Sequence, residues 1–307
     1  MENIITITLN PSIDKSTTVH ALVPEKKMRC SSPKFEPGGG GVNVSRALKK
    51  LGCSSTAVFL AGGYSGKFYE SLLQKEGIET LVIPISAHTR ENLIVLDEAA
   101  NLQYRFGMPG PAVHENEWRE CLKILRSNSG YEYVVISGSN APGTPLDFYS
   151  EAAKIAKEKN AKLIIDTSED ALKHALNTGV FLVKPNMGEL SSLTGAKELD
   201  AGCVVDSARK IINKGNCEVM IVSMGASGAM LVTAKEKYHE AAPAVKSKST
   251  VGAGDSMLAG IIIALQKKWP WKNVLRYGVA AGTAATMNSG TELCKKEDVE
   301  KIYSFFQ

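Results

Sequence analysis

Short runs rich in valine and isoleucine alternate with helix-like segments along most of the 307 residues. Six runs have the composition of buried strands: 4–9, 55–63, 133–139, 162–167, 181–185 and 219–225. Several are apolar at consecutive positions, as strands covered by helices on both faces are. Between them, apolar residues recur at helical spacing, as at Val44, Ala47, Leu48 and Leu51. Repeated strand–helix–strand units predict an α/β fold with a mainly parallel sheet between two layers of helices.

Two segments, 15–37 and 88–107, interrupt this alternation. Polar and apolar residues alternate in both, with no helical period, which predicts antiparallel hairpins with one exposed face. Both segments leave the core and return to it, so we expect one small β-sheet lid on a single domain spanning 1–307. An apolar sheet face is rarely left bare, and a second subunit that covers it would make the protein a homodimer.

The charge balance is close to neutral, with 36 basic and 32 acidic residues and a net charge of +4. This small excess argues against a nucleic-acid binder, while converging positive residues would suit an anionic substrate. The first residues lack the basic and apolar regions of a secretory signal, and the apolar run 257–265 is too short to span a bilayer. The six cysteines form no zinc-binding pattern, so we expect reduced thiols in a cytoplasmic protein with no membrane contact.

The segment 252–255, Gly-Ala-Gly-Asp, precedes an almost wholly apolar run. Glycines at a helix start let several backbone amides point at one spot, where the helix dipole adds partial positive charge. This pattern predicts an anion hole formed by Gly252, Ala253 and Gly254. Asp255 is unfavourable beside a bound anion unless it takes a proton from a hydroxyl that attacks a phosphoryl group. The alternative is an ordinary N-capping aspartate, but the buried helix that follows favours a site.

Four consecutive glycines, 38–41, stand at the start of another predicted helix. Ordering four glycines is costly in backbone entropy, and a flexible linker rarely leads directly into an amphipathic helix, so close approach of a ligand is the favoured interpretation. Asn43, on the first turn, is placed to hydrogen-bond a sugar hydroxyl. Asp14, at the carboxyl end of the first strand, would reach polyol hydroxyls. The alternative for Asp14 is a capping residue in an ordinary turn.

Three basic residues fall in the two lid segments. Arg90 and Arg105 lie on the predicted lid strands, where two guanidinium groups would hold a phosphate ester bidentately. Exposed strand arginine is the commoner explanation for either one alone. Lys27 shares the lid and the same alternative.

Asn186 and Glu189 follow the predicted strand at 181–185 and share one helical face. They would orient the water shell of a Mg²⁺ ion that is held chiefly by phosphate oxygens. A capping box with Asn186 as the N-cap explains the same pair, and both interpretations can hold together. The glycine-rich segment 223–229 predicts a tight turn between strands, either a plain hairpin or a turn that packs under a nucleotide.

In this order, the motifs resemble the PfkB family of sugar kinases within the ribokinase superfamily. The resemblance covers essentially the whole chain and includes two family signatures, the glycine-rich helix start at 38–43 and the block 249–260. Stretches such as ISGSNAPG, KPNMGEL and GVAAGTAATMNSGTELC are most similar to the minor 6-phosphofructokinase branch. The family implies a ribokinase-like three-layer αβα fold with a β lid, one catalytic domain over 1–307, and ATP and Mg²⁺ as cosubstrate and cofactor.

The resemblance also implies a role for individual residues. Asp255 would be the catalytic base, beside the anion hole of Gly252, Ala253 and Gly254. The positions that would hold the sugar phosphate are Asp14, Gly39, Asn43, Arg90, Arg105 and Ser139. The positions on the nucleotide side are Lys27, Lys184, Asn186, Ser223, Gly225, Gly228 and Asn288. Mg²⁺ would be reached through water by Asn186 and Glu189. The backbone positions around a monovalent cation, usually K⁺, are Ser249, Val251, Ala285, Asn288 and Gly290.

Two residues depart from the family pattern. Glu292 stands where the branch leads us to expect arginine, which reverses a charge beside the loop that would bind the cation. Glu91 follows Arg90 and adds a negative charge next to the expected phosphate site. The first change leaves a dependence on K⁺ open, and the second would weaken the binding of the phosphate.

The implied reaction is the ATP-dependent phosphorylation of fructose 6-phosphate to fructose 1,6-bisphosphate. Tagatose 6-phosphate and fructose 1-phosphate differ from this substrate in one stereocentre or in phosphate position, so both stay open as alternatives. A non-catalytic sensor of sugar phosphate or nucleotide is the alternative from another class. A carboxylate at Asp255, in an intact amide cradle, argues against a sensor, because a sensor needs no base.

Overall fold

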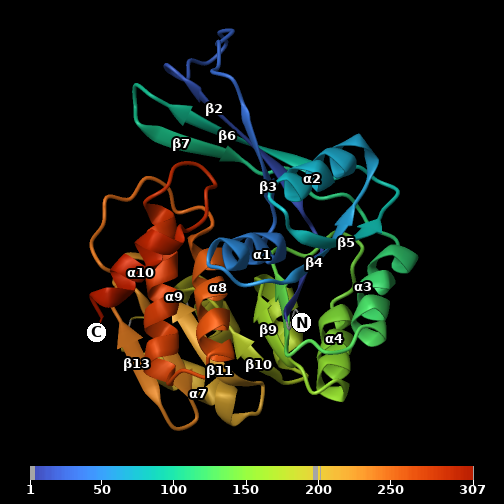
Figure 1. The fold of residues 1–307 in the computed structure, drawn as a ribbon, viewed down its shortest axis with the longest axis vertical. Helices are drawn as coiled ribbons and strands as arrows, with labels where there is room; N and C mark the ends of the chain where they lie inside the picture. Colours follow the sequence, from blue (N-terminus) through green and yellow to red (C-terminus); the bar gives the residue numbers. More distant parts are fainter. Residues whose placement is uncertain (1–3, 196–199, 201, 307) are drawn as a thin grey trace.

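The computed structural model describes residues 4–195, 200 and 202–306, and its main body is built on one nine-stranded sheet (Figure 1). The strand order is β13-β12-β11-β10-β9-β8-β1-β4-β5. The six strands that the sequence predicts are present: β1 (Ile4–Thr8), β4 (Thr56–Ala61), β8 (Tyr133–Ser137), β9 (Lys162–Asp166), β10 (Val180–Val183) and β11 (Cys217–Ser223). They pair with one another in parallel, which confirms the mainly parallel sheet. The ends of the predicted domain, 1–3 and 307, lie outside the described residues.

Three further strands extend the two sides of this sheet and are not among the six apolar runs: β5 (Glu79–Pro84), β12 (Ala229–Thr233) and β13 (Lys237–Glu240). β5 pairs in parallel with β4, and β12 and β13 extend the opposite edge in antiparallel pairs. Edge strands are partly solvated, so β5 and β13 alternate exposed and half-buried positions instead of forming apolar runs. A short 3₁₀ turn, Gly225–Ser227, joins β11 to β12, as the predicted hairpin requires.

Helices cover both faces of the sheet. One layer contains α1 (Gly40–Lys50), α2 (Gly63–Lys75), α8 (Ala253–Gln266), α9 (Trp271–Thr286) and α10 (Lys296–Ser304). The other layer contains α3 (Glu115–Ser127), α4 (Asp147–Glu158), α5 (Glu169–Leu176), α6 (Met187–Thr194) and α7 (Val204–Asn213). Consecutive strand residues pack into opposite layers, for example Ile4 in one core cluster and Ile5 in the other. This arrangement explains why the central strands are apolar at successive positions.

Helix α8 lies inside its layer, and most of its side chains are fully buried. Its close packing against α9 depends on glycines. An added Cβ at Gly260 would lie 2.9 Å from the carbonyl oxygen of Tyr277, and one at Gly282 would lie 3.2 Å from that of Ala253. These contacts hold the N-terminal turn of α8 in place. Among the described residues no helix is both long and apolar enough to cross a membrane, and burial accounts for the apolar character of α8.

A second sheet of four strands forms the lid, in the order β3-β2-β6-β7 (Figure 1). Its strands are β2 (Ser12–Val19), β3 (Lys34–Gly38), β6 (Arg90–Asp97) and β7 (Leu102–Phe106). The pairs β2–β3 and β6–β7 are antiparallel, as the two predicted hairpins require, and the central pair β2–β6 is parallel. In Figure 1 the loop that joins β2 to β3 is at the tip of the lid, away from the helices of the main body.

Hydrogen bonds from α1, α2 and the loop after α9 join the lid strand β3 to the main body, among them that of Arg46 Nη1 to the carbonyl oxygen of Pro37 at 2.8 Å. Tyr69 on α2 donates from its hydroxyl to the carbonyl oxygen of Gly38 at 2.8 Å. Thr291, in the loop after α9, donates from Oγ1 to Glu36 Oε2 at 2.6 Å. The lid is therefore anchored at the strand that leads directly into α1.

Candidate active site

The predicted anion hole is the N-terminus of α8. Gly252 is its N-cap and has a φ of +74°, a left-handed conformation that favours glycine. A Cβ at this position would also lie 2.6 Å from the side chain of Leu293. First-turn amides have no acceptor within a helix, and the helix dipole is positive there. The amide of Ala253 makes only a long contact, 3.4 Å, with the carbonyl oxygen of Thr250. The turn can therefore donate to an anion.

Asp255 lies on this turn, and groups from other elements surround its carboxylate. Asn43 Nδ2, on α1, donates a hydrogen bond to Asp255 Oδ2 at 3.0 Å. Burial raises the pKa of the Asp255 carboxyl from 3.8 to about 6, and the negative charge of Asp166 adds to the rise. The hydrogen bond from Asn43 and the charges of Lys184 and Arg46 lower this pKa. A carboxylate whose pKa is close to neutral pH suits a general base.

The glycine run at 38–41 brings the start of α1 against the ends of two strands. Gly39 is the N-cap of α1 and has a φ of +115°. A Cβ at Gly40 would lie 2.4 Å from a side-chain oxygen of β8, and one at Gly41 would lie 2.5 Å from a carbonyl oxygen of β1. Only glycine fits between these elements without displacing them. The close contact directs the first turn of α1, with Asn43, toward the carboxylate on α8.

Asp14 lies on the lid strand β2, and not at the carboxyl end of β1 where the sequence placed it. The chain crosses from the main sheet to the lid between these two strands, so the residue reaches the site from the lid. Asp14 Oδ1 accepts hydrogen bonds from Ser12 Oγ and Asn92 Nδ2, both at 2.9 Å. An added Cβ at Gly38 would lie 2.4 Å from Asp14 Oδ2. Burial raises the pKa of the Asp14 carboxyl, although both hydrogen bonds lower it.

Arg90 begins β6, and its guanidinium reaches toward the main body. Nη2 donates to the carbonyl oxygen of Asn10 at 3.0 Å and lies 3.5 Å from Ser139 Oγ, while Nη1 donates to the carbonyl oxygen of Met108 at 3.1 Å. Within the described residues Nε is buried and has no hydrogen-bond partner. Burial lowers the pKa of Arg90, and the charge of Asp14 raises it. A guanidinium beside a serine hydroxyl, with one donor unused, suits a phosphate ester.

The other lid residues lie farther from this point. Arg105 is exposed on β7 and is paired with Ile94, four residues along β6 from Arg90. At about 3.3 Å per residue, the two arginine backbones are about 13 Å apart along the strand direction. Lys27 is exposed in the loop between β2 and β3. Glu91 points to the face of the lid opposite Arg90, because successive strand residues alternate, so its charge does not face the guanidinium.

A pocket of about 540 Å³ lies on the nucleotide side of the α8 N-terminus. Its lining includes three predicted nucleotide positions and two anion-hole positions: Ser223, Gly225, Gly228, Ala253 and Gly254. Segment 242–247 and helix α9 supply mainly apolar or small side chains to the remaining wall. An apolar cleft that ends at backbone amides fits a purine base attached to phosphates.

Lys184 is buried next to the anion hole. Its Nζ pairs with Asp166 Oδ2 at 3.0 Å and would lie 3.4 Å from a Cβ added at Gly254. Burial lowers the pKa of Lys184, but Asp166 and the carboxylates of Asp255 and Glu189 raise it above its ordinary value overall. The ammonium is therefore charged at neutral pH, and it lies where a phosphate at the helix terminus would be bound.

Asn186 and Glu189 form the predicted capping box at the start of α6. Asn186 Oδ1 accepts from the amide of Glu189 at 2.9 Å, and Glu189 Oε2 accepts from the amide of Asn186 at 2.8 Å. Burial raises the pKa of Glu189, and the charge of Asp166 adds to the rise. Among the described residues no three His, Cys, Asp or Glu side chains converge on a metal site. A Mg²⁺ ion at this point would take most of its ligands from phosphate and water.

The residues predicted around a monovalent cation lie on two adjacent loops. Ser249 Oγ donates to the carbonyl oxygen of Gly290 at 2.7 Å, and the amide of Ser249 donates to that of Thr286 at 3.3 Å. Val251 continues the first loop, and Ala285 lies where α9 leads into the second. The two loops are thus in contact, and their backbone carbonyls are the kind of oxygen ligand that a monovalent cation requires.

Two side chains of the second loop face elsewhere. Asn288 Nδ2 donates to the carbonyl oxygen of Leu293 at 3.0 Å, and Asn288 is not among the residues that line the nucleotide pocket. Glu292 pairs with Lys295 at 3.4 Å and lines a separate, charged cavity. The carboxylate that replaces the expected arginine therefore has a cationic partner within the same loop.

Four polar residues of the site belong to none of the motifs recognised in the sequence: Asn10, Arg46, Asn92 and Asp166. Asp166 ends β9, and its position at the carboxyl end of a predicted strand was a usable signal. Asn92 shares a lid face with Arg90, which the alternation of strand residues also indicates. The hydrogen bonds of Asn10, and those of Arg46 to Glu76, depend on residues distant in the sequence, and no local pattern indicates them.

The sequence matches the pfkB family of carbohydrate kinases over residues 7–298. The ATP-dependent 6-phosphofructokinase isozyme 2 of Escherichia coli (strain K12) is 42% identical over 307 residues, covering 99% of both chains. A crystal structure of phosphofructokinase-2 from Escherichia coli in complex with potassium has a TM-score of 0.95 at 42% identity and covers 99% of each chain. Arabidopsis thaliana ribokinase, at 18% identity and a TM-score of 0.80, shares the fold over 99% of each chain.

These matches and the three-layer body with its lid sheet define a ribokinase-like fold, as the sequence predicts. The chain belongs to the pfkB family of carbohydrate kinases. Within that family it is an ATP-dependent sugar kinase, and its whole length is similar to phosphofructokinase-2 of Escherichia coli.

Proposed function

We propose that the protein transfers the γ-phosphoryl group of ATP to the C1 hydroxyl of fructose 6-phosphate, which gives fructose 1,6-bisphosphate and ADP. The observation that carries this proposal is the position of Asp255 at the N-terminus of α8. Its carboxylate accepts a hydrogen bond from Asn43 on α1, and its neighbours on the same turn, Ala253 and Gly254, line the 540 Å³ pocket. The 42% identity to a 6-phosphofructokinase supports fructose 6-phosphate as the acceptor.

The proposed chemistry is an in-line transfer. The C1 hydroxyl oxygen of the sugar forms a bond to the γ-phosphorus while Asp255 accepts the hydroxyl proton. The bond between the γ-phosphorus and the bridging oxygen breaks, and that oxygen leaves with ADP. The amides of Gly252, Ala253 and Gly254 and the ammonium of Lys184 stabilise the negative charge on the transferred group. The proton passes to solvent when the product leaves.

The lid orients the sugar phosphate. Arg90 and Ser139 are proposed to bind the 6-phosphate, with the buried Nε of Arg90 as the additional donor. Asp14, Asn43 and the backbone at Gly39 are proposed to contact sugar hydroxyls. Because the phosphate is held on the lid side and Asp255 on the body, the opposite end of the ketose is directed toward the base.

Two cations complete the proposed site. Mg²⁺ would offset the charge of the ATP phosphates, and Glu189 and Asn186 would orient its water ligands. K⁺ would be surrounded by backbone carbonyls of the two loops that the Ser249–Gly290 hydrogen bond joins. The crystal structure of the Escherichia coli enzyme with potassium supports this assignment.

We propose that the main body and the lid act as one catalytic domain over 1–307, with the lid at about 15–37 and 88–107. We also propose that the lid forms the contact of a homodimer. Large apolar side chains are exposed on and just after β7, namely Leu102, Tyr104, Phe106 and Met108. The first three alternate along the strand and therefore share one lid face. Such a face is commonly covered by a second subunit. Lys27 and Arg105 on the exposed part of the lid would then lie near this contact.

The choice of substrate is tested by ADP release with a panel of ketose phosphates. We expect the highest kcat/KM with fructose 6-phosphate, lower values with tagatose 6-phosphate and fructose 1-phosphate, and no turnover without a sugar phosphate. A higher kcat/KM with either alternative would reassign the substrate and leave the kinase reaction intact. Binding of sugar phosphate and ATP without ADP release would show a sensor.

Arg90→Ala should raise the KM for fructose 6-phosphate by about 10- to 100-fold, because it removes charge-assisted hydrogen bonds to the phosphate. The KM for ATP should change little, since the nucleotide pocket does not include the lid. Arg105→Ala is the matched variant on the exposed lid strand and should raise the sugar-phosphate KM less. Steady-state kinetics with each substrate varied would measure this, and equal increases in both KM values for Arg90→Ala would contradict its placement.

A further inference from the structure

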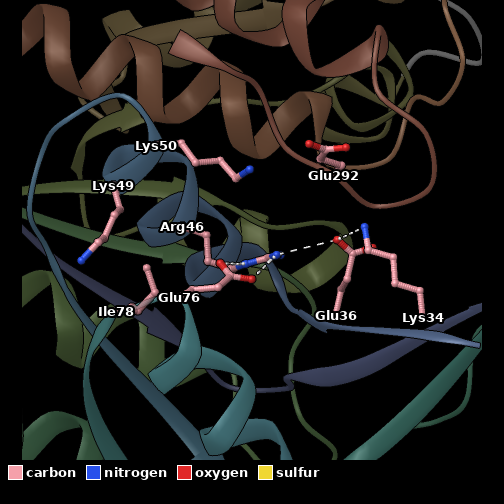
Figure 2. A pocket seen from close by; sticks show the side chains of 8 residues that line it. All are labelled: Lys34, Glu36, Arg46, Lys49, Lys50, Glu76, Ile78 and Glu292. Carbon is pink, nitrogen blue, oxygen red and sulfur yellow. Dashed lines mark hydrogen bonds and ion pairs between the residues drawn. The ribbon is translucent and has the colours of Figure 1, made fainter.

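Arg46 is a buried arginine of α1 that belongs to no part of the proposed chemistry so far. Its side chain is only 3% exposed, although arginine is seldom buried unless it is paired. Figure 2 shows its guanidinium between Glu76 at the end of α2 and Glu36 on the lid strand β3. Its N–H groups face four partners: Glu76, Glu36, the backbone of Pro37 and the side chain of Asn43. Asn43 in turn contacts Asp255 on α8.

The pairing with Glu76 fixes the plane of the guanidinium. Arg46 Nε and Nη2 donate to the two carboxylate oxygens of Glu76 at 2.8 and 2.7 Å, a bidentate geometry. Nη1 donates to the carbonyl oxygen of Pro37 at 2.8 Å and to Asn43 Oδ1 at 3.1 Å. Nη2 is also 4.0 Å from Glu36 Oε1. The guanidinium therefore joins α1, the end of α2 and the lid at one point.

The contact with Asn43 decides which end of its amide faces the base. An asparagine side chain can present either its oxygen or its NH₂ group, and arginine can only donate. Because Arg46 Nη1 takes the oxygen of Asn43, the NH₂ group faces Asp255 and donates to Oδ2 at 3.0 Å. A rotated amide would place its oxygen against the carboxylate and lose both hydrogen bonds.

We propose that Arg46 is a positioning residue for phosphoryl transfer: it orients the Asn43 amide, which in turn holds the Asp255 carboxylate in place. This inference rests on the proposed role of Asp255 as the base. Arg46 touches neither substrate in the proposed arrangement, so its effect on the reaction passes through Asn43.

Charged groups around Asp255 predict the direction of the effect. The carboxylate is faced by Asp166 from β9, Lys184 from the segment after β10, and Asn43 and Arg46 from α1. The hydrogen bond from Asn43 and the charge of Arg46 both lower the pKa of Asp255. Loss of Arg46 removes its charge and leaves the Asn43 amide free to rotate, so both effects weaken and the pKa of Asp255 rises. The acid limb of the kcat/KM profile, expected near pH 6, should then move to higher pH.

A charged cavity of about 400 Å³ lies beside Arg46 and offers a direct test. It is lined by Lys34, Glu36, Arg46, Lys49, Lys50, Glu76, Ile78 and Glu292 (Figure 2). Truncating the arginine would leave Glu36 and Glu76 without their shared cation. A guanidinium ion entering from this cavity has the charge and the planar donors to replace it.

The experiment compares Arg46→Ala with Lys50→Ala, a control on the same helix and in the same cavity. We expect Arg46→Ala to lower kcat by about 10- to 100-fold, the effect of one charge-assisted hydrogen bond, and to move the acid limb to higher pH. Millimolar guanidinium chloride should restore part of kcat and return the limb toward its original position. Lys50→Ala should keep the wild-type profile with and without guanidinium.

A second set of variants keeps the test decisive if Arg46→Ala does not fold. Arg46→Lys retains the charge but not the fork, so its acid limb should shift in the wild-type background. In the Asn43→Ala background the same substitution should produce no further shift, because the group that transmits the effect is absent. Equal shifts in both backgrounds, or an unchanged pH profile for Arg46→Ala, would overturn the proposal.

The same data separate this inference from the proposed function. Asp255→Asn tests the base independently of Arg46. An inactive Asp255→Asn together with a wild-type profile for Arg46→Ala would reject the positioning role alone. An active Asp255→Asn would reject the base and, with it, the reason for the relay.

Discussion

Replacing Asp255 by asparagine should lower kcat by about 10²–10⁴-fold, the usual contribution of a general base, while both substrates still bind. Asparagine keeps the shape of the side chain but cannot accept the C1 proton. Calorimetric titration with fructose 6-phosphate and with a non-hydrolysable ATP analogue would show whether binding survives. Near-normal turnover in this variant would remove Asp255 from the mechanism.

The pH dependence of kcat/KM and of stability tests the role of Asp255 in a second way. Because the pKa of Asp255 is raised to about 6, kcat/KM of the wild-type enzyme should fall below about pH 6 as the base becomes protonated. Stability should change in the opposite direction. The folded protein holds this proton more tightly than the unfolded chain, so the contribution of Asp255 to stability is greatest below about pH 4 and is lost as pH rises from about 4 to about 6.

The asparagine variant carries no charge at this position, so it should be at least as stable as the wild type at pH 7.5. Urea unfolding at several pH values would measure this. Asp147→Asn is a suitable control, since Asp147 is an exposed aspartate in the first turn of α4. It should leave kcat unchanged. A large loss of stability in Asp255→Asn would mean that its low activity reflects misfolding.

Among the single substitutions proposed here, Lys184→Met should cause the largest loss of stability, and it should also lower activity. Lys184 and Asp166 are 6% and 16% exposed, and breaking a buried pair leaves one charge uncompensated. We expect the free energy of unfolding to fall by about 3–5 kcal/mol. Removing a cation from the transferred phosphoryl group should also lower kcat by about 10²–10³-fold. Urea unfolding and steady-state kinetics measure the two effects separately.

The double variant Lys184→Met with Asp166→Leu distinguishes these effects. Replacing both partners of a buried pair by apolar residues often restores stability, so most of the lost free energy of unfolding should return. Activity should stay low, because no cation faces the anion hole. Recovery of activity along with stability would show that Lys184 serves only to hold the fold.

Much of the main body could be predicted from the sequence because its central strands are buried on both faces. Six apolar runs marked β1, β4 and β8 to β11, and these alone define a parallel α/β sheet. The strands β5 and β13, at the two edges of the sheet, lack this signal, since half of their positions are exposed. The lid hairpins were predictable from polar and apolar alternation, but the parallel pairing of β2 with β6 was not. That pairing joins residues almost 80 positions apart, such as Asp14 and Asn92.

The candidate site could be predicted where a motif carries its own backbone conformation. Gly252 adopts a positive φ and starts α8, so the segment itself forms the amide cradle. The site could not be predicted where a side chain depends on distant partners. Asp14 appeared to end the first strand because nothing local shows where the chain crosses to the lid. Arg46 has no local signal of burial, and only the approach of Glu76 and the lid buries it.

The proposed acceptor contacts and the nucleotide pocket differ in how they are assembled. The pocket is formed within residues 223–286 and is complete in the body alone. The acceptor side needs two separate sheets, because Asp14 and Arg90 belong to the lid and Asp255 to α8. A small tilt between the sheets would thus misalign the alcohol with the phosphorus while leaving nucleotide affinity intact. Substitutions that tighten or loosen the contact between the lid and the main body would therefore change turnover without altering any reacting group.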